Sequence, residues 1–283
     1  MPLPTARKLF GPEKCRYRTQ TMDHSRLSDI RAQAPLIHNI TNYVVMNISA
    51  NALLAIGASP VMAHAIDEVA EMVKLARALV INIGTLSTAW VEAMTDAART
   101  ASALGIPIVL DPVGCGATAY RNRTVQDLID TARPAVIRGN ASEIRALVRS
   151  AGGTKGVDSL HTPEEALEDA VTLSRSLGCT VSVSGPTDIV VAGDQVARIR
   201  NGDPIMTRVT GMGCTASAVT GAYIAVEADA FEAAVQSMIT MGVAGELAAA
   251  KAAGPGSFQM HFIDALHGLS EADLRKRAKV NFD

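Results

Sequence analysis

Several common signatures of function are missing from this sequence of 283 residues. Aromatic residues make up only 4% of it and charged residues 19%, whereas 48% of the residues are hydrophobic. This composition supplies a sizeable core and excludes a chain that is disordered throughout. Few aromatic and many small aliphatic side chains are typical of parallel strands covered by alanine-rich helices, so we expect an α/β fold.

An excess of charge and a long apolar segment are also missing. The formal net charge of −2 provides no general attraction to nucleic acid or to anionic membranes. The apolar runs are interrupted by Gly, Pro, Asn or Asp well before the ~20 residues that a membrane-spanning helix needs. We therefore expect a soluble protein that has no nucleic-acid partner and no membrane partner.

The cysteines form no CxxC pair, and the first residues lack the apolar region of a secretory signal. The scattered spacing disfavours structural zinc and a disulfide framework, and it is typical of a protein in the reducing cytoplasm. We expect residues 1–34 to be an N-terminal extension, partly disordered or peripheral, and residues 35–283 to be a single domain. The cysteines are Cys15, Cys115, Cys179 and Cys214.

Short β-branched runs alternate with longer alanine-rich segments along the chain. The runs at 79–83, 106–110, 135–138 and 180–184 predict strands, and the segment 88–103 predicts a helix. A hairpin is expected further on, with strands at 188–192 and 195–200. Repeated strand–helix units predict a mostly parallel sheet that is flanked by helices on both faces.

Small or polar residues end five of the predicted strands. Ligands of open α/β sheets bind at the carboxyl ends of the strands, where such segments converge. A binding site is therefore expected at this edge of the sheet. The five segments are Asn82-Ile-Gly-Thr85, Asp111-Pro-Val-Gly114, Arg138-Gly-Asn140, Ser184-Gly185 and Thr210-Gly-Met-Gly213.

Two glycines spaced by one residue precede an alanine-rich stretch that predicts a helix from about Thr215. Glycines let backbone N–H groups approach a ligand closely, and the helix N-terminus adds about half a positive charge. We expect an anion hole for a transferring phosphoryl group, formed by the N–H groups of Gly211, Met212, Gly213 and Cys214. The alternative is an ordinary glycine-rich turn. The chain contains no GxxxxGK[ST] loop, so the site is not of the Walker type.

Cys214 stands at the expected start of that helix. Because a helix N-terminus lowers the pKa of a thiol, Cys214 is a candidate proton acceptor or polar neighbour for a substrate hydroxyl. The alternative is a small packed cysteine.

Two acidic residues are candidates for binding Mg²⁺, which prefers one or two carboxylates together with water and phosphate oxygens. Asp111 follows an apolar strand directly, and Glu143 lies three residues after Asn140 at a strand-to-helix junction. The alternative for the second pair is a capping box, with Asn140 as the N-cap residue.

Three further residues are candidates for binding small molecules. Asn39 belongs to the polar segment 38–42, which could contact the edge of a heterocycle, and Met62 could pack against its face. Arg121 ends a glycine-rich loop and could pair with nucleotide phosphates, although a solvated surface arginine is the alternative.

The ordered motifs resemble those of the hydroxyethylthiazole kinase family. The resemblance runs from about residue 35 to about residue 250. Besides the strand ends given above, it rests on His38-Asn-Ile-Thr-Asn42, Gly57-Ala-Ser-Pro-Val-Met-Ala63, Lys155-Gly-Val-Asp-Ser159 and Thr210-Gly-Met-Gly-Cys214.

This resemblance implies a ribokinase-like fold and transfer of the ATP γ-phosphoryl group to the hydroxyl of 4-methyl-5-(2-hydroxyethyl)thiazole, in thiamine biosynthesis or salvage. It also implies Mg²⁺, a homotrimer with active sites between subunits, and a place for Asn39 in an adjoining protomer's pocket. By motif, Met62 and Gly211 match thiazole-contacting positions, and Arg121 and Ser184 match ATP-contacting positions.

Three further positions follow from the same resemblance. Asp111 and Glu143 match acidic positions near Mg²⁺, with Asn140 beside them in the MgATP site. Cys214 stands where other ribokinase-like kinases have an aspartate base.

Two other readings of the sequence stay open at this point. One is a related kinase that acts on another small alcohol, such as hydroxymethylpyrimidine. The other is a nucleotide-binding or sensor protein that has kept the fold without catalysis. A dehydrogenase is disfavoured, because no GxGxxG follows the first strand of a βαβ unit.

Overall fold

The computed structural model describes residues 25–150 and 163–283, and within them nine strands form one sheet in the order β2-β1-β3-β4-β5-β6-β7-β8-β9. Strands β1 to β6 pair in parallel, and β7 to β9 are antiparallel. The mostly parallel sheet and the predicted hairpin are confirmed. The strands are β1 (Leu36–Ile40), β2 (Ser59–Val61), β3 (Ala78–Asn82), β4 (Ile108–Asp111), β5 (Val136–Asn140), β6 (Thr180–Ser184), β7 (Asp188–Ala192), β8 (Gln195–Ile199) and β9 (Val280–Phe282).

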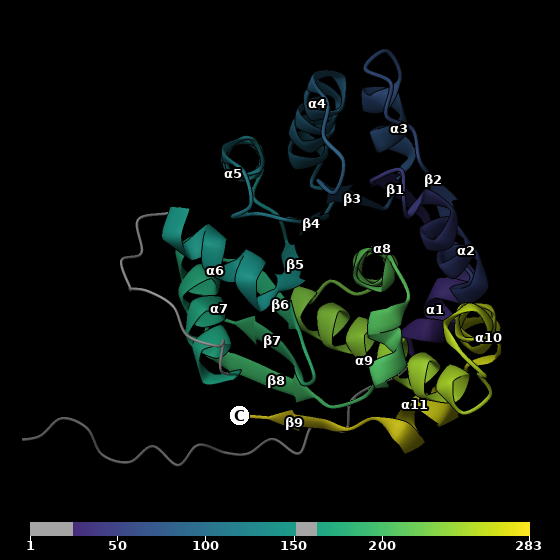
Figure 1. Cartoon of the computed structure of the whole chain (residues 1–283). Helices are drawn as coiled ribbons and strands as arrows, with labels where there is room; N and C mark the ends of the chain where they lie inside the picture. The colour runs from purple at the N-terminus through teal and green to yellow at the C-terminus, as the bar shows by residue number, and fades with distance from the viewer. Residues whose placement is uncertain (1–24, 151–162) are drawn as a thin grey trace, which may run out of the picture.

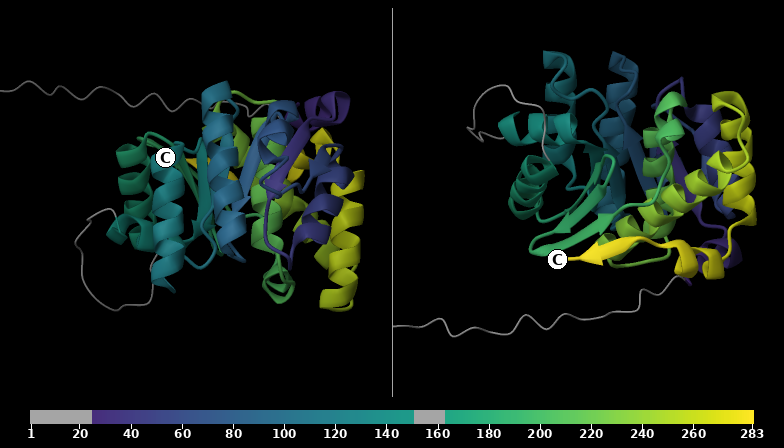
Figure 2. Two further views of the ribbon diagram at one scale, coloured as in Figure 1. Left: turned by 90° about the horizontal axis from the view of Figure 1, so that it is seen from above. Right: turned by 60° about the horizontal axis from the view of Figure 1, so that its bottom comes forward.

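Helices cover both faces of this sheet (Figures 1 and 2). Helices α3 to α7 pack on one face, and α8 and α9 pack on the other with α2 and α10 outside them. The described helices are α1 (Arg26–Gln33), α2 (Met46–Ile56), α3 (Val69–Leu75), α4 (Thr88–Leu104), α5 (Ala119–Thr131), α6 (Ala141–Ser150), α7 (Pro163–Leu177), the 3₁₀ helix η1 (Pro204–Arg208), α8 (Met212–Ile224), α9 (Ala230–Ala249), α10 (Pro255–Gly268) and α11 (Glu271–Arg277).

The central strands carry apolar side chains on both faces. In β3, Leu79 and Ile81 belong to the core under α4 and α5, whereas Ala78 and Val80 belong to the core under α8 and α9. Because successive side chains of a strand point to opposite faces, a strand covered on both sides must be apolar throughout. This requirement explains the continuous hydrophobic runs in the sequence.

Helix α1 lies within the segment that we expected to be a peripheral extension. Its residues Leu27 and Ile30 are 1% and 0% exposed and join the core that contains α8. The folded core therefore begins before residue 35. Residues 1–24, with Cys15, and the motif at 155–159 lie outside the described residues.

None of the helices in residues 25–150 and 163–283 combines the length and the apolar character that a membrane crossing requires.

Candidate active site

The carboxyl ends of the parallel strands meet at one edge of the sheet. Asn82 and Asp111 end β3 and β4 and lie opposite each other in the strand register. Asn140 and Ser184 end β5 and β6 and are paired in the same way. The convergence that the sequence predicted is confirmed for these four residues.

The glycine turn leads directly into helix α8. Gly211 has a φ of +85°, and a Cβ there would lie 2.8 Å from Cγ1 of Val45, so both conformation and space require glycine. The helix begins at Met212, three residues before the predicted start. Gly213 and Cys214 therefore belong to its first turn, whose N–H groups have no partner within a helix. Such a turn suits an anion.

Two asparagine side chains connect Cys214 to Asp111. The Nδ2 atom of Asn82 donates to Oδ2 of Asp111 at 2.7 Å, and Nδ2 of Asn42 donates to Oδ1 of Asn82 at 2.9 Å. The Nδ2 atom of Asn42 also lies 3.5 Å from Sγ of Cys214, within hydrogen-bond distance of a sulfur. A continuous chain of polar groups thus crosses from β4 to α8.

The pKa values of the two ends of this chain are raised. Burial raises the pKa of Asp111 to about 6, although the charge of Arg138 and a hydrogen bond of 2.7 Å from Oγ of Ser217 oppose the change. Burial, and then the carboxylate of Asp111, raise the pKa of Cys214 to about 11. The predicted lowering of the pKa of the Cys214 thiol is wrong, because loss of solvent outweighs the effect of the helix end. The thiol is neutral at neutral pH.

Arg138 is the site residue that the sequence reasoning missed. It lies in β5, is only 6% exposed, and has no hydrogen-bond partner for Nε among the described residues. Its guanidinium lies beside Gly213, since a Cβ there would be 2.8 Å from Nη1. Its charge lowers the pKa values of Asp111, Cys214 and Asp188. The signal was a charged residue at the end of an apolar strand.

Arg121 has a different position. Its guanidinium donates to the carbonyl oxygens of Ile83 at 2.7 Å and Gly84 at 2.9 Å, and to that of Val113. These bonds fasten the loop after β3 to the loop after β4. The ATP contact of Arg121 stays a prediction, since its donors are directed at the backbone.

Glu143 and Asn140 form the capping box that we gave as the alternative. The Oδ1 atom of Asn140 accepts from N of Glu143 at 3.0 Å, and Oε2 of Glu143 accepts from N of Asn140 at 2.8 Å. The other carboxylate oxygen, Oε1, accepts from N of Gly114 at 2.8 Å. The structure thus gives Glu143 a capping role, and its contact with Mg²⁺ stays a prediction.

A cavity of about 620 Å³ opens beside Arg138 and the glycine turn. Its volume is in the range of small-molecule sites. The polar lining comes from β5, β6, β7 and the loop after β8, and the apolar lining includes three methionines of η1 and α9. The residues are Arg138, Ser184, Gly185, Pro186, Asp188, Arg200, Asn201, Gly202, Asp203, Pro204, Met206, Thr207, Val209, Gly211, Met212, Gly213, Ala216, Met238, Met241 and Gly242.

Asn39 and Met62 lie away from that cavity. Asn39 is 1% exposed in β1, where Nδ2 donates to the carbonyl of Ile37 at 3.0 Å. Met62 follows β2 at the edge of the sheet, and its carbonyl lies 3.1 Å from Nδ1 of His64. Neither residue is among those that line the cavity. Their contacts with a thiazole stay predictions.

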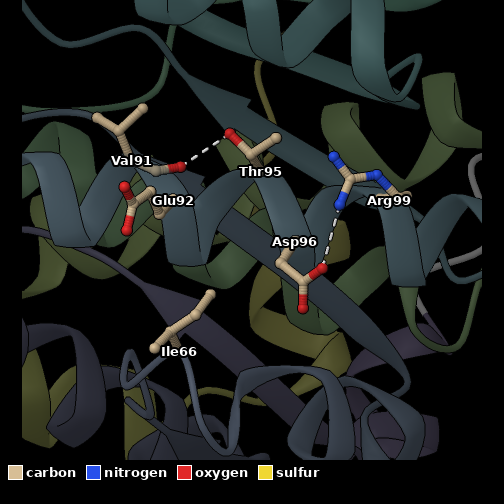
Figure 3. A pocket seen from close by; sticks show the side chains of 6 residues that line it. All are labelled: Ile66, Val91, Glu92, Thr95, Asp96 and Arg99. Carbon is tan, nitrogen blue, oxygen red and sulfur yellow. Dashed lines mark hydrogen bonds and ion pairs between the residues drawn. The ribbon is translucent and has the colours of Figure 1, made fainter.

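A second hollow, of about 380 Å³, lies on α4 (Figure 3). Two of its charged groups are turned toward each other, since Nη1 of Arg99 is 3.1 Å from Oδ1 of Asp96. The hydroxyl of Thr95 donates to its own helix at Val91. This arrangement leaves little for a substrate. The hollow is lined by Ile66, Val91, Glu92, Thr95, Asp96 and Arg99.

Comparison with known proteins agrees with the anion-binding site described above. The model of the hydroxyethylthiazole kinase family matches residues 27–272. A hydroxyethylthiazole kinase from Syntrophus aciditrophicus (strain SB) is 56% identical over 89% of this chain and 93% of its own length. This chain belongs to the hydroxyethylthiazole kinase family. It is a kinase that phosphorylates an alcohol, with ATP as the co-substrate that kinases use.

Two further comparisons agree with the family. A hydroxyethylthiazole kinase from Nitratidesulfovibrio vulgaris (strain DSM 19637 / Miyazaki F) is 54% identical over 89% of this chain and 94% of its own. The solved structure of a hydroxyethylthiazole kinase protein from Pyrococcus horikoshii OT3 has a TM-score of 0.86 and 43% identity, covering 92% of this chain and 98% of that one. The family match includes α1 from its second residue onward, a helix that the resemblance at the sequence level had left out.

More distant structures identify the fold alone. A ribokinase-like superfamily protein from Enterococcus faecalis V583 has a TM-score of 0.59 at 12% identity, covering 92% of this chain and 98% of that one. A pyridoxal kinase from Staphylococcus aureus, solved with AMP-PCP and pyridoxal, has a TM-score of 0.58 at 16% identity, covering 75% and 87%. The expected ribokinase-like fold is confirmed.

Proposed function

We propose that the first turn of α8, Arg138 and Cys214 carry phosphoryl transfer from ATP to the hydroxyl of 4-methyl-5-(2-hydroxyethyl)thiazole. The observation that supports this most is the position of Arg138. A buried guanidinium lies beside Gly213, at the point where the N–H groups of α8 are free. Arginine and helix N–H groups together neutralise the charge that spreads over the transferring group.

The cavity beside this turn is the proposed ATP site. Ser184 and Arg138 face the phosphates. The hydroxyl of Ser184 donates to the carbonyl of Gly139 over a long 3.4 Å, so it can turn to donate to a phosphate oxygen instead. Met206, Met238 and Met241 provide an apolar wall that suits the face of a nucleobase. We assign the phosphate contact expected of Arg121 to Arg138, because Arg138 lines the cavity beside the glycine turn and Arg121 does not line it.

Cys214 orients the substrate hydroxyl in this proposal. A thiol with a pKa of about 11 carries almost no thiolate at neutral pH, so it cannot remove the hydroxyl proton before transfer. The transition state of phosphoryl transfer is loose, and positioning contributes much of the rate. A sulfur that accepts a hydrogen bond from the hydroxyl would point its oxygen at the γ-phosphorus. The new O–P bond forms as the bond to ADP breaks, and the hydroxyl proton passes to an oxygen of the transferred phosphoryl group.

The residues at the strand ends fit Mg²⁺, although they do not form a complete cage. Asp111 accepts both of its hydrogen bonds with Oδ2, and within the described residues no hydrogen bond reaches its Oδ1. The described residues contain no group of three or more acidic, histidine or cysteine side chains placed for one ion. Mg²⁺ is commonly held by one or two carboxylates, water and phosphates, so Asp111 and Glu143 would suffice. When bound, the ion neutralises phosphate oxygens.

A panel of alcohols with MgATP tests the substrate. We expect the wild-type enzyme to phosphorylate the thiazole alcohol in preference to hydroxymethylpyrimidine and pyridoxal, with ADP formed only when an acceptor is present. Preference for another alcohol contradicts the proposed substrate, and ADP formation without acceptor contradicts the proposed transfer. Activity measured with and without Mg²⁺, for the wild type and for Asp111→Asn, tests the metal assignment.

We also propose a homotrimer in which a neighbouring protomer completes each site, and action in the cytoplasm. Tyr43 and Val44 directly follow Asn42, yet these residues are 64% and 66% exposed. The ring of Tyr43 lies 4.7 Å from that of Trp90, which His64 contacts from 4.5 Å. An exposed aromatic surface beside a site suits a second protomer. Light scattering should give three chains, and Val44→Asp should lower both the mass and the activity.

A further inference from the structure

We propose that Asn42 and Asn82 are positioning residues for phosphoryl transfer. Asn42 donates a hydrogen bond to the sulfur of Cys214, and Asn82 helps to hold the amide of Asn42 in the orientation that allows this. This inference rests on the proposed role of Cys214 and names the residues through which that role is set.

The orientations of both amides follow from backbone donors. A backbone N–H can only donate, and N of Gly84 donates at 2.9 Å to Oδ1 of Asn82. The N–H of Val44 donates at 3.1 Å to Oδ1 of Asn42. Each side-chain oxygen is thereby identified, so each Nδ2 must point the other way.

The two Nδ2 groups then have defined partners. The Nδ2 group of Asn82 donates to the carboxylate of Asp111 at 2.7 Å. Asn42 divides its two N–H bonds between Oδ1 of Asn82 at 2.9 Å and Sγ of Cys214 at 3.5 Å. The sulfur therefore accepts from Asn42, and a hydrogen bond from Asn82 also lowers the pKa of the Cys214 thiol against the effect of burial.

Gly84 provides independent support for this arrangement. A Cβ at Gly84 would lie 2.5 Å from Nδ2 of Asn42 and 2.9 Å from Oδ1 of Asn82. Its φ lies outside the left-handed region, so space and not conformation requires glycine here. Asn42 and Asn82 are also 4% and 1% exposed, so little solvent reaches them to replace a lost partner. The backbone at Gly84 therefore leaves room for the contact between the Asn42 and Asn82 side chains only because residue 84 has no side chain.

A double-mutant cycle on the full chain tests the inference. We expect Asn42→Leu to lower kcat about tenfold in the wild-type background while KM for ATP changes less than about twofold. In the Cys214→Ala background the same change should lower kcat less than about twofold, because its target is gone. Asn51→Leu is the control, since Asn51 is exposed and its side chain donates only to Asn47 in the described residues.

Gly84→Ala is the second variant, in case Asn42→Leu does not fold. It keeps every amide but displaces Asn42, so it should show the same dependence on Cys214. Its control is Gly256→Ala, where a Cβ meets nothing within 4 Å. Equal losses in both backgrounds overturn the inference, because Asn42 then acts on the fold or on the substrate directly. An unchanged Cys214→Ala enzyme overturns the proposed role of Cys214 itself, and this single variant separates the two failures.

Discussion

The guanidinium of Arg138 and the backbone of Gly213 are in close contact, since a Cβ on Gly213 would lie 2.8 Å from Nη1 of Arg138. The contact joins β5 to the first turn of α8. Gly213 does not have a positive φ, so its small size is the property that matters. A side chain at this position would separate the buried cation from the N–H groups that the same anion is proposed to bind.

Gly213→Ala therefore tests the anion hole. Alanine fits helical backbone, so we expect the variant to fold with a melting temperature within a few degrees of the wild type. The displaced guanidinium and the blocked approach to the N–H groups should lower kcat about 10- to 100-fold. Steady-state kinetics beside thermal melts check both parts, with Gly256→Ala as the control. A fully active Gly213→Ala enzyme contradicts the assignment of this turn.

Two lysine substitutions distinguish the roles of the two arginines. Arg138 lines the cavity, whereas Arg121 holds two loops together through hydrogen bonds to their carbonyls. Lysine keeps the charge but loses the planar fork, so Arg138→Lys should lower kcat about 10- to 100-fold. Arg121→Lys should mainly reduce stability, by about 1–3 kcal/mol, because it leaves backbone carbonyls without donors. Kinetics and denaturant titrations on both variants measure the split. If Arg121→Lys keeps its stability and loses activity, Arg121 contacts ATP as the resemblance implied.

Cys214→Asp tests whether position 214 serves the substrate hydroxyl. An aspartate accepts a hydrogen bond and is a stronger base at neutral pH than a thiol whose pKa is about 11. We expect the variant to keep at least about a tenth of the wild-type kcat, and Cys214→Ala to fall below it. Loss of all activity in a folded Cys214→Asp protein contradicts the assignment of the hydroxyl to this position.

Much of this architecture could be predicted because the relevant signals are local. The apolar run at Leu79–Ile83 and the glycine turn at Gly211 are written in consecutive residues, and the topology of parallel strands brings their ends together. The start of α8 was placed three residues late because the conformation that ends the glycine turn was not visible in the pattern.

The properties that sequence reasoning missed depend on three-dimensional surroundings. The raised pKa of Cys214 comes from burial and from Asp111, which belongs to a strand far earlier in the chain. Arg121 donates to the backbone carbonyls of residues 83, 84 and 113. Every residue has such a carbonyl, so the sequence does not indicate which ones accept a hydrogen bond from Arg121. The sequence analysis named Arg138 only as part of a strand-end motif, because the presence of a charged residue in a strand does not reveal which groups its side chain contacts.

Asp188→Asn should change how stability depends on pH. Burial raises the pKa of Asp188 to about 6 from 3.8, although N–H of Gly185 and the charge of Arg138 oppose this. The folded state then binds more protons than the unfolded state between these values, so this carboxyl stabilises the fold progressively as pH falls through about 6. Asparagine still accepts from Gly185 but carries no charge to bury.

Thermal melts across this range give the test. The variant should be more stable than the wild type at about pH 8, by on the order of 1–3 kcal/mol, and the advantage should shrink toward about pH 5. Asp194→Asn is the control on the same hairpin, because the Asp194 side chain is 87% exposed. A stability difference that is constant with pH contradicts the raised pKa.

Glu246 connects the cavity-lining loop after β8 to Lys279, the residue before the C-terminal strand β9. Its Oε1 accepts from Nδ2 of Asn201 at 3.0 Å, from N of Gly202 at 3.2 Å and from Nζ of Lys279 at 2.8 Å. Asn201 also accepts from N of Lys279 at 2.8 Å, so one carboxylate organises the loop after β8 and the approach to β9. Asn201 and Gly202 both line the cavity that we assign to ATP.

Glu246→Ala should therefore raise KM for ATP several-fold with little change in KM for the alcohol. Lys279→Ala is the matched variant, since it removes a partner of the same carboxylate whose side chain is 58% exposed, against 17% for Glu246. Exposed ion pairs contribute about 0–1 kcal/mol, so Lys279→Ala should leave KM for ATP within about twofold. Equal effects of the two variants would mean that the ion pair, and not the hydrogen bonds to the loop, maintains the cavity wall.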